Sequence, residues 1–442
     1  MKTLNKESFI YIDDKSVSDN LQIQVIKSDN AFDLISDEWH ALVEKADIHY
    51  VQTYDWLRSW WKHFGGGQHR LHIILFRHKQ ELVGIMPMYL ETFKFVGLPL
   101  YRCLRMLGGR VIQPSGGALP VELPFGDYLT LIAFPGREKI ITSTLIKYLM
   151  TNRHLFDRIW LEEIPEGSPL LALTKIEFND QNWNCNVRPA SKSYIIKINS
   201  PWSSYLEKLS SKARYQVRRT LRVNDENQHF ERQLAHTEEE VLTAYMKLVE
   251  YHQQRWQSLG QPGIFSDDRI NNFFKDITMH FHKKGWLQLE MLVKGNAYEA
   301  IDLLFCFHGT LYQVQRGYKD SPYDKRIGPG NLLLYLRIKE AINSGVKVFD
   351  FLRGEIPYKR SLSTHTVQNK EIIISNSQTW SNRIKIHQSM KYYYWFQYKL
   401  SHQMKIMKVI SSPKSTHSGR GIYAKYLCGK VSEKFYRLLK NN

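Results

Sequence analysis

The stretch 350–359, DFLRGEIPYK, places two acids, an arginine and a lysine directly after an apolar run. Side chains alternate along a strand, so Asp350 shares one face of a predicted strand over 346–351 with two valines. A carboxylate on an otherwise buried strand needs a partner or its pKa rises. We therefore interpret Asp350 as a candidate general base or as the residue that orients one. Arg353 can pair with it, in which case a structural salt bridge explains both residues.

Arg353, Tyr358 and Lys359 follow this predicted strand closely, and Gly354 allows the chain to turn sharply between them. Functional side chains are often carried by a loop that follows a rigid strand. We assign all three to a catalytic site together with Asp350.

A second acid, Asp302, lies in a segment that predicts a three-stranded meander. Residues 286–318 break into strands at two glycine-containing turns. With a two-residue loop at 308–309, Asp302 is expected to lie opposite Gln315. Its neighbours in the strand are apolar, so it is another candidate general base. The alternative is that Asp302 only bonds its neighbours.

Two features indicate contact with phosphate groups. Gly328 and Gly330 stand directly before a predicted helix, where free backbone N–H groups and the helix dipole favour an anion. The alternative is an ordinary Gly-Pro-Gly turn. Arg214, Arg218 and Arg222 are spaced to lie along one face of a helix, with no acid expected to offset them four residues on. This stripe favours phosphate or nucleic-acid contact over a solvated face.

The chain contains an internal repeat. Segments 134–165 and 328–357 each run from Pro-Gly through a helical apolar pattern to Phe-Asp and then Glu-Ile-Pro. A strand-rich region precedes each copy, so each half predicts helices, antiparallel strands, a glycine turn, a helix and a buried strand. Asp157 recurs in the first copy, whereas Arg353, Gly354 and the Tyr-Lys pair occur only in the second.

This pattern predicts a mixed α/β protein of two similar domains, each a mixed sheet flanked by helices. The boundary is placed near 188–192, where small and polar residues cluster between predicted strands. The predicted units are residues 1–190, 191–375 and a tail, 376–442. A length of 442 residues with 43% hydrophobic content also agrees with two domains.

Much of the formal charge of +18 belongs to the tail. Residues 381–442 hold thirteen lysines and arginines against one acid, together with the aromatic run 391–400. Such a mixture suits an anionic membrane surface or single-stranded nucleic acid, or else a terminal helix whose aromatic side chains pack on the body. No apolar run is long enough for a membrane span, and the four cysteines have no metal-ligand spacing, so we expect a cytoplasmic protein without a metal.

Three stretches together resemble a known family: 317–362, 210–222 and 251–267. They are similar to the acetyltransferase-like proteins linked to bacterial cellulose and exopolysaccharide synthesis, which belong to the GNAT superfamily. They are also similar to the FemAB peptidyltransferases, whose two tandem GNAT-like domains agree with the repeat. The resemblance covers most of residues 30–362 and excludes the tail.

The resemblance implies transfer of an acyl group from a thioester, typically acyl-CoA, to an amine or hydroxyl. GNAT enzymes hold the CoA pyrophosphate at a glycine turn that opens a helix. The matching positions here are Lys325, Arg326, Gly328, Gly330 and Asn331. The usual signature has Gln or Arg where Lys325 stands, and this chain also has a proline between the glycines.

We therefore expect an acyltransferase of envelope or exopolysaccharide metabolism, cytoplasmic or peripheral at the inner face of the membrane. Acyl-CoA is the expected co-substrate, with no permanently bound cofactor. Arg353, Tyr358 and Lys359 would shape the acceptor site, in a cleft between the carboxy-terminal domain and a non-catalytic amino-terminal partner.

Two alternatives remain open. In the FemAB relatives the donor is aminoacyl-tRNA, which the arginine stripe and the basic tail suit, although the long helical hairpin that several FemAB enzymes insert is absent from the sequence. The second alternative is an inactive GNAT pair that binds an anionic polymer or a membrane surface.

Overall fold

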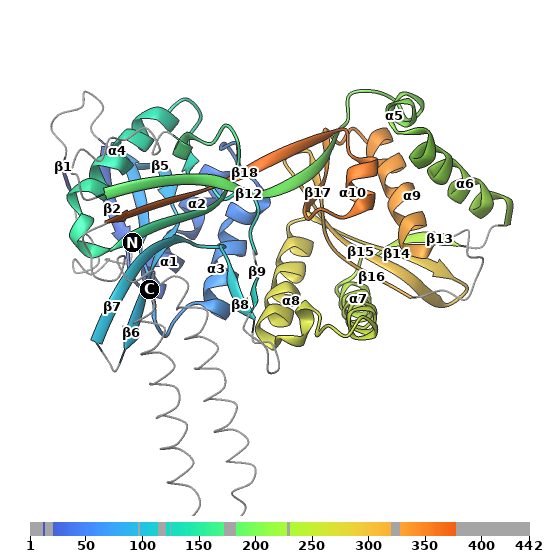
Figure 1. Ribbon diagram of the computed structural model, residues 1–442, viewed down its shortest axis with the longest axis horizontal. Coiled ribbons are helices and arrows are strands. Elements are labelled where there is room, and N and C mark those ends of the chain that lie inside the picture. The colour runs from blue at the N-terminus through green and yellow to red at the C-terminus, as the bar shows by residue number, and fades with distance from the viewer. Residues whose placement is uncertain are drawn as a thin grey trace, which may run out of the picture.

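A computed structural model describes most of the chain. The described residues are 12–13, 21–95, 98–113, 121–123, 125–171, 183–227, 230–319 and 328–376. The predicted tail, Lys325 and Arg326 therefore lie outside the described residues. We call residues 21–171 the amino-terminal half and residues 202–362 the carboxy-terminal half; two long strands, β12 and β18, run between them (Figure 1).

The described part of the amino-terminal half contains six helical segments of α or 3-10 type and a set of mostly short strands. The short strand β1 (Ile12–Asp13) precedes this half. The elements of the half are β2 (Leu21–Ile26), α1 (Asp29–Leu34), α2 (Ser36–Val43), η2 (Tyr50–Gln52), α3 (Tyr54–Phe64), β3 (His69–Leu71), β4 (Ile73–His78), β5 (Glu81–Met86), β6 (Met88–Phe95), β7 (Leu98–Met106), β8 (Val111–Gln113), β9 (Val121–Leu123), β10 (Ile132–Ala133), α4 (Glu138–Thr151), η3 (Arg153–Leu155) and β11 (Arg158–Ile164). 

The carboxy-terminal half is built from longer helices around a meander. The remaining elements are β12 (Trp183–Lys197), α5 (Trp202–Lys208), α6 (Ser211–Asn227), β13 (Glu231–Leu234), α7 (Glu238–Ser258), η5 (Ile264–Ser266), α8 (Asp268–Lys283), β14 (Leu287–Lys294), β15 (Ala297–Phe307), β16 (Thr310–Tyr318), α9 (Pro329–Asn343), β17 (Val348–Arg353), α10 (Pro357–Leu362) and β18 (His365–Asn376).

Local sequence explains where the main helices begin. Thr237 and Glu240 form a capping box at the start of α7, each side chain accepting a backbone N–H of the other residue. Asp267 caps α8, and Thr53 caps α3 in the same way. The helices expected before the meander of the carboxy-terminal half are present as α5, α6, α7 and α8, and the extended Leu209 separates α5 from α6.

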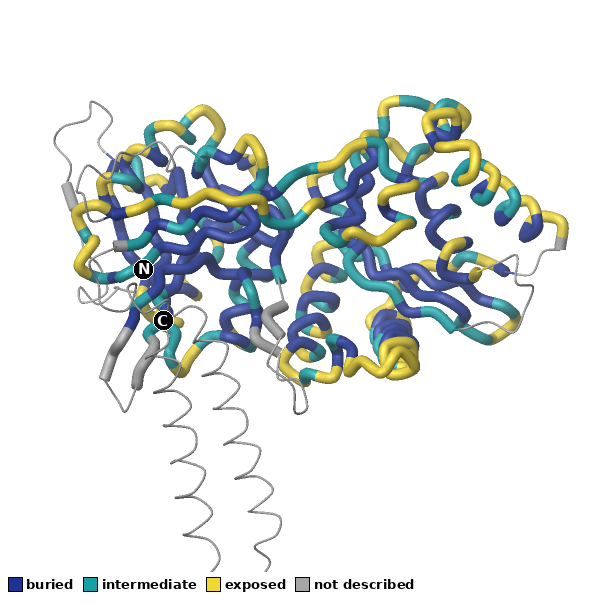
Figure 2. The backbone as a smooth tube through the Cα atoms, viewed as in Figure 1, coloured by how far each residue is buried: buried dark blue, intermediate teal, exposed yellow. Residues whose placement is uncertain are grey.

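One mixed sheet runs through both halves. Its eleven strands follow the order β13-β14-β15-β16-β17-β12-β18-β11-β7-β6-β3. The strands β2, β4, β5, β1 and β10 form a separate sheet of the amino-terminal half. The central strands of both halves are mostly buried, whereas β13, part of β12 and the outer faces of α5 and α6 are exposed (Figure 2).

The two halves exchange strands at the centre of this sheet. β12 follows β11 in the chain but pairs along β17 of the carboxy-terminal half, and β18 follows β17 but pairs along β11 of the amino-terminal half. β12 and β18 also pair with each other over most of their length. Each half is therefore completed by a strand from the other side of the molecule.

The repeat predicted from the sequence is confirmed as a structural one. In the first copy α4 leads into β11, which lies parallel to β7, and in the second α9 leads into β17, which lies parallel to β16. Near the end of each strand stands one non-glycine residue with left-handed backbone, Glu163 in β11 and Leu352 in β17.

The predicted boundary segment 188–192 does not lie between strands. It lies inside β12, where the pairing with β18 shifts register between Pro189 and Lys192. The small and polar residues there produce a bulge within a continuous strand instead of a linker. In addition, residues 370–375, assigned to the second domain, pair with β11 of the first half.

The hydrophobic core is also continuous between the halves. One cluster of buried side chains includes residues from β2 to β18. Across the junction, Trp56 of α3 packs edge-on against Phe273 of α8, and Tyr50 packs against Phe281 and Phe305. Strand exchange and a shared aromatic core both oppose separate unfolding of the halves.

We predict that the chain unfolds in a single cooperative transition and that a core change in β18 affects both halves. Ile372 is fully buried opposite Leu161 of β11, so Ile372→Ala should cost about 2–4 kcal/mol. Urea unfolding followed by circular dichroism and by tryptophan fluorescence should give coincident, shifted curves. Ile356→Ala, at a 45% exposed position, is the matched control and should change little. Two separated transitions in the parent protein would contradict this.

Candidate active site at the junction of the halves

Asp350 lies at the point where two parallel strands part. Its pairing with Tyr312 is the last register pair between β16 and β17, although both strands continue beyond it. The carboxyl group is buried and accepts two hydrogen bonds, from the Leu352 backbone N–H at 2.7 Å and from the Tyr128 hydroxyl at 2.8 Å. Burial raises the pKa of Asp350 to about 7, against the opposite effect of these two donors.

Lys359 brings a buried amine to the same place. The Nζ group donates to the carbonyl oxygens of Leu352 and Arg353 at the end of β17. Burial lowers the pKa of Lys359 to about 8, and the nearby Asp127 and Asp350 carboxyls act in the other direction. Asp350 and Lys359 thus form an acid and base pair with pKa values near neutrality, which is typical of catalytic sites.

Arg353 does not pair with Asp350, contrary to the sequence-based alternative. Its Nε lies 2.8 Å from Asp127 Oδ1 and its Nη1 lies 3.3 Å from Glu163 Oε1, so Arg353 forms ion pairs with two acids of the amino-terminal half. The left-handed Leu352 (φ 58°) interrupts the alternation of the strand, so Arg353 turns toward the other half. Burial raises the pKa of Asp127, and Arg353 opposes that rise.

We call Asp127, Glu163, Asp350, Arg353 and Lys359 the junction cluster. It holds three carboxyl groups and two cationic groups. The two carboxyls from the amino-terminal half pair with Arg353, whereas the partners of Asp350 described above are neutral donors. Burial is the main cause of the raised pKa of Asp350, and the nearby Asp127 carboxyl adds to it.

Backbone strain gathers at the same place. Six non-glycine residues in the described chain have positive φ, and three of them belong to hairpin turns. The others are Tyr128, Glu163 and Leu352, with φ between 54° and 58°. All three touch the junction cluster or belong to it. Such conformations cost about 1–3 kcal/mol each and concentrate at functional sites, where the surroundings enforce them.

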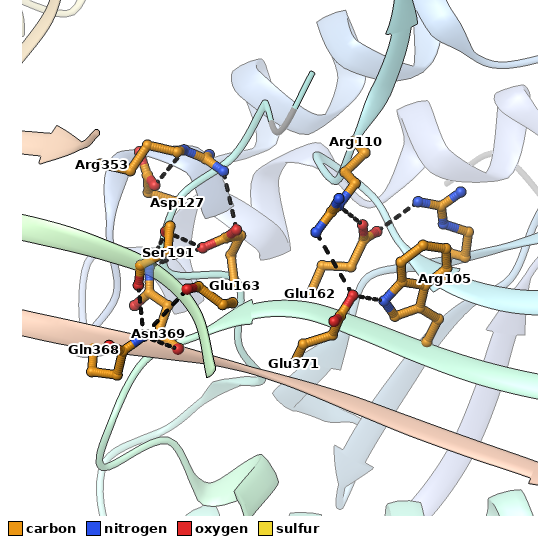
Figure 3. A network of polar contacts seen from close by, with 12 residues as sticks. Arg105, Arg110, Asp127, Glu162, Glu163, Ser191, Arg353, Gln368, Asn369 and Glu371 are labelled. Atoms are coloured by element: carbon orange, nitrogen blue, oxygen red, sulfur yellow. Dashed lines mark hydrogen bonds and ion pairs between the residues drawn. The ribbon is translucent and has the colours of Figure 1, made fainter. Parts of the chain in front are cut away.

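In the first copy the position equivalent to Asp350 is Trp160, and ion pairs occupy the end of the strand close to it (Figure 3). The last parallel pair there joins Arg105 and Trp160, and Glu162 lies 2.8 Å from Arg105 Nη2 and 2.6 Å from Arg110 Nε. The start of α4 is occupied too, because Glu138 accepts the Gly136 N–H at 3.1 Å. In the first copy, charged side chains of the amino-terminal half therefore bind the groups at the strand end and at the helix start. In the second copy, Asp350 accepts hydrogen bonds from neutral donors, and the first turn of α9 carries no acid.

Asp302 is held by neighbouring side chains. Arg316 grips it with two hydrogen bonds, at 2.7 and 2.9 Å, and Gln313 donates a third at 2.9 Å. The expected pairing with Gln315 is wrong, because a bulge between Leu303 and Leu304 shifts the register and places Arg316 opposite Asp302. This geometry fits the structural alternative better than a free base.

Tyr358 stands between the two acid sites. The Arg316 guanidinium lies 5.5 Å from the centre of its ring, which also packs edge-on against Phe351. Burial raises the pKa of Tyr358, so the hydroxyl is neutral at physiological pH. The exposed side of the same helix, α10, borders a shallow surface depression lined by Glu355, Pro357, Arg360 and Ser361.

The glycine turn at α9 gives its two glycines different roles. A Cβ on Gly330 would lie 2.9 Å from Cδ1 of Tyr318, so this glycine is required by ring packing. At Gly328 a Cβ would meet only the Asn331 amide at 3.6 Å, and Asn331 itself is exposed. The first turn of α9 carries no acid, so an anion approaching Gly328 meets no negative side chain there.

The arginine stripe lies on α6 as expected, with Arg218 and Arg222 exposed and Arg214 partly buried. The expectation that no acid offsets it is wrong at one position. Arg222 Nε lies 3.7 Å from Glu226 Oε1, four residues on. Both side chains are exposed, so this pair stabilises the helix only weakly.

The side chains that the amino-terminal half contributes to this site were not predicted from the sequence. Asp127 and Tyr128 lie in a loop after β9, and His49 Nδ1 is 2.8 Å from the Tyr312 hydroxyl across the junction. The only available signal was an acid beside a tyrosine within the apolar run 123–134. That signal cannot reveal a partner more than 200 residues away.

Comparison with known proteins agrees with this architecture. Residues 211–360 match the model of the Acetyltransferase (GNAT) domain. The crystal structure of FemX superposes with a TM-score of 0.53 at 12% identity, covering 79% of this chain and 98% of FemX. The fold is therefore a mixed α/β fold like that of FemX, with the GNAT match in the carboxy-terminal half.

Two further structures were found at lower similarity. The C-terminal domain of a putative lysylphosphatidylglycerol synthetase from Agrobacterium fabrum has a TM-score of 0.44 at 8% identity, covering 78% of this chain and 92% of that one. A tandem GNAT protein from the clavulanic acid biosynthesis pathway has a TM-score of 0.38 at 9% identity, covering 80% and 98%. A search of curated proteins returned no match.

The described residues contain neither a candidate membrane-spanning helix nor a candidate metal-binding cluster. Over that part of the chain, no helix combines the length and the apolar character needed to cross a membrane. Within the same ranges, no group of three or more His, Cys, Asp or Glu side chains is placed to hold a metal ion.

We predict that Asp350→Asn stabilises the protein at alkaline pH. The folded-state pKa of Asp350 lies above its unfolded value, so its burial costs stability progressively as pH rises from about 4 to 7. The uncharged amide avoids this cost and should gain on the order of 2 kcal/mol at about pH 8, with little change at about pH 4. Urea unfolding at both pH values measures the difference.

Asp302→Asn is the matched control. It leaves the buried Arg316 guanidinium without its carboxylate and should destabilise by about 3 kcal/mol or more at about pH 8. Equal destabilisation of the two variants at that pH would show that Asp350 is an ordinary structural carboxylate.

Proposed function

We propose that this protein is an acyltransferase that moves an acyl group from acyl-CoA to an amine or hydroxyl acceptor. The observation that carries the proposal is Asp350, a buried carboxyl with a pKa of about 7 at the fork of the parallel strands in the GNAT-like unit. A general base works best when its pKa is close to the operating pH. The structural partnership of Asp302 with Arg316 makes Asp350 the better of the two candidate bases.

In the proposed reaction the acceptor loses a proton to Asp350 as its lone pair attacks the thioester carbonyl. The tetrahedral intermediate collapses by breaking the carbon–sulfur bond, and the thiolate of CoA leaves. Lys359, with a pKa of about 8, can supply the proton that this thiolate takes up. Proton transfer from Asp350 to Lys359 then restores both groups. Arg353 holds Asp127 and Glu163 and so acts as a positioning residue for the junction.

The donor is assigned to the turn at the start of α9. Gly328 is open, Asn331 is exposed and no acid stands in the first turn, so phosphate oxygens can approach. Lys325 and Arg326 would add positive charge to the same turn. The acceptor is proposed to be an envelope or exopolysaccharide precursor, approached between the halves near Tyr358.

The second candidate is an aminoacyl-tRNA-dependent transferase like the FemAB proteins. The fold shared with FemX and the exposed arginines of α6 favour it. A binding module without turnover is the third, and the strained, near-neutral Asp350 site argues against it because such features serve chemistry better than binding.

We predict that the purified protein releases free thiol from acyl-CoA in the presence of an amine or amino-sugar panel. RNase should have no effect on this turnover, whereas loss on RNase treatment would support the tRNA donor. Asp350→Asn should lower kcat by about 10²–10⁴-fold, since the base is removed while donor binding is retained. A correctly folded protein without turnover on any donor would support the binding module.

We predict that Gly328→Leu raises the KM for acyl-CoA by about tenfold or more, with an unchanged melting temperature, because its side chain projects into open space where the donor would lie. Gly330→Ala is the control, and it should lower the melting temperature through its clash with Tyr318. An unchanged KM in Gly328→Leu would remove the α9 turn from the donor site.

A further inference from the structure

We propose that the amino-terminal half is a working part of the active site, with its Tyr128 hydroxyl positioning the Asp350 carboxylate for proton transfer. This inference rests on the proposed function of Asp350 as the base. It changes the expected role of the amino-terminal half from a structural partner to a contributor of a side chain on which the reaction depends.

The ring of Tyr128 is held by a stacked imidazole that is itself bonded to a neighbouring tyrosine. The Tyr128 ring stacks on the His49 imidazole, with ring centres 4.2 Å apart and planes 25° from parallel. His49 in turn bonds the Tyr312 hydroxyl at 2.8 Å, and Tyr312 lies opposite Asp350 in the parallel pair. The Tyr128 hydroxyl lies 2.8 Å from Asp350 Oδ2. The contacts that hold its ring lead through His49 to Tyr312, which is the strand partner of Asp350.

The backbone of Tyr128 is fixed as well. Its left-handed conformation is enforced by the residues on either side, which both bond to other elements. Asp127 pairs with Arg353 of β17, and the Leu129 N–H donates to the Glu163 carbonyl at 3.0 Å. A tyrosine held in a strained conformation by both neighbours is preorganised for its hydrogen bond to the carboxylate of Asp350.

The contact favours the ionised form of Asp350. A hydroxyl donated to a carboxylate stabilises the charged state and so lowers its pKa, against the burial that raises it. Burial raises the pKa of Tyr128 itself, so it remains a neutral donor over the working range. The other charged or titratable groups around Asp350 are His49, Tyr50, Asp127, Tyr312, Arg353 and Lys359.

The test is the pH dependence of acyl transfer in Tyr128→Phe. This variant keeps the ring and removes the donor, so the pKa of Asp350 should rise and the acidic limb of kcat should move up by about one pH unit. Activity should fall about tenfold on the acidic side and recover at high pH, with the donor KM unchanged. Tyr245→Phe is the control, because it removes a buried tyrosine hydroxyl that bonds Asn271 outside the junction cluster, and it should leave the limb in place.

A second measurement separates this inference from the proposed function. Titration of 13C-labelled aspartate by NMR, assigned with Asp350→Asn, reports the pKa of Asp350 without any turnover. An upward shift in Tyr128→Phe supports the inference even if no acyl-CoA is consumed, in which case the proposed function alone fails. An unchanged pKa or an unmoved acidic limb overturns the inference. His49→Leu, which removes the stacking partner, should shift the pKa in the same direction by less, and it serves if Tyr128→Phe does not fold.

Discussion

The exchange of β12 and β18 between the two halves is the constraint on which the rest of the structure depends. β12 follows the amino-terminal half in the chain and pairs with β17, and β18 follows the carboxy-terminal half and pairs with β11. Neither half can therefore close its sheet alone. Because the two strands also pair with each other, the ends of β11 and β17 are brought to either side of one ribbon. The positions that the repeat makes equivalent are therefore neighbours in space.

This neighbourhood is what allows five ionisable groups to be buried together. Removing charges from water costs several kcal/mol for each ion, and the cost is offset only where the geometry is fixed. Arg353 reaches Asp127 and Glu163 because two left-handed residues, Glu163 and Leu352, turn the strand ends toward each other. The carboxyl that remains, Asp350, is balanced by hydrogen bonds instead of a guanidinium, which leaves it able to exchange a proton.

Local pattern was enough to predict the units of this fold, but not their assembly. The glycine turn, helix and buried strand of each copy follow from apolar spacing and capping residues, and so does the meander. One bulge at Leu303 was sufficient to replace Gln315 by Arg316 opposite Asp302, and no residue type signalled it. Asp350 was found because an acid in an apolar strand is conspicuous. Tyr128 was not, since its importance comes from a contact between segments that only the exchanged strands bring together.

The difference between the two copies shows which features make a site from a shared framework. In the first copy the carboxylate of Glu162 lies between two guanidinium groups, so taking up a proton would sacrifice two ion pairs. The first helix turn there is also occupied by its own glutamate, Glu138. In the second copy the first turn of α9 carries no acid among the described residues, and Asp350 is held by neutral donors. The helix and strand of the first copy thus serve as structural support, because Glu162 is paired with guanidinium groups of the same half. The helix and strand of the second copy form a candidate catalytic site, because Asp350 has no guanidinium partner in the described part of the chain.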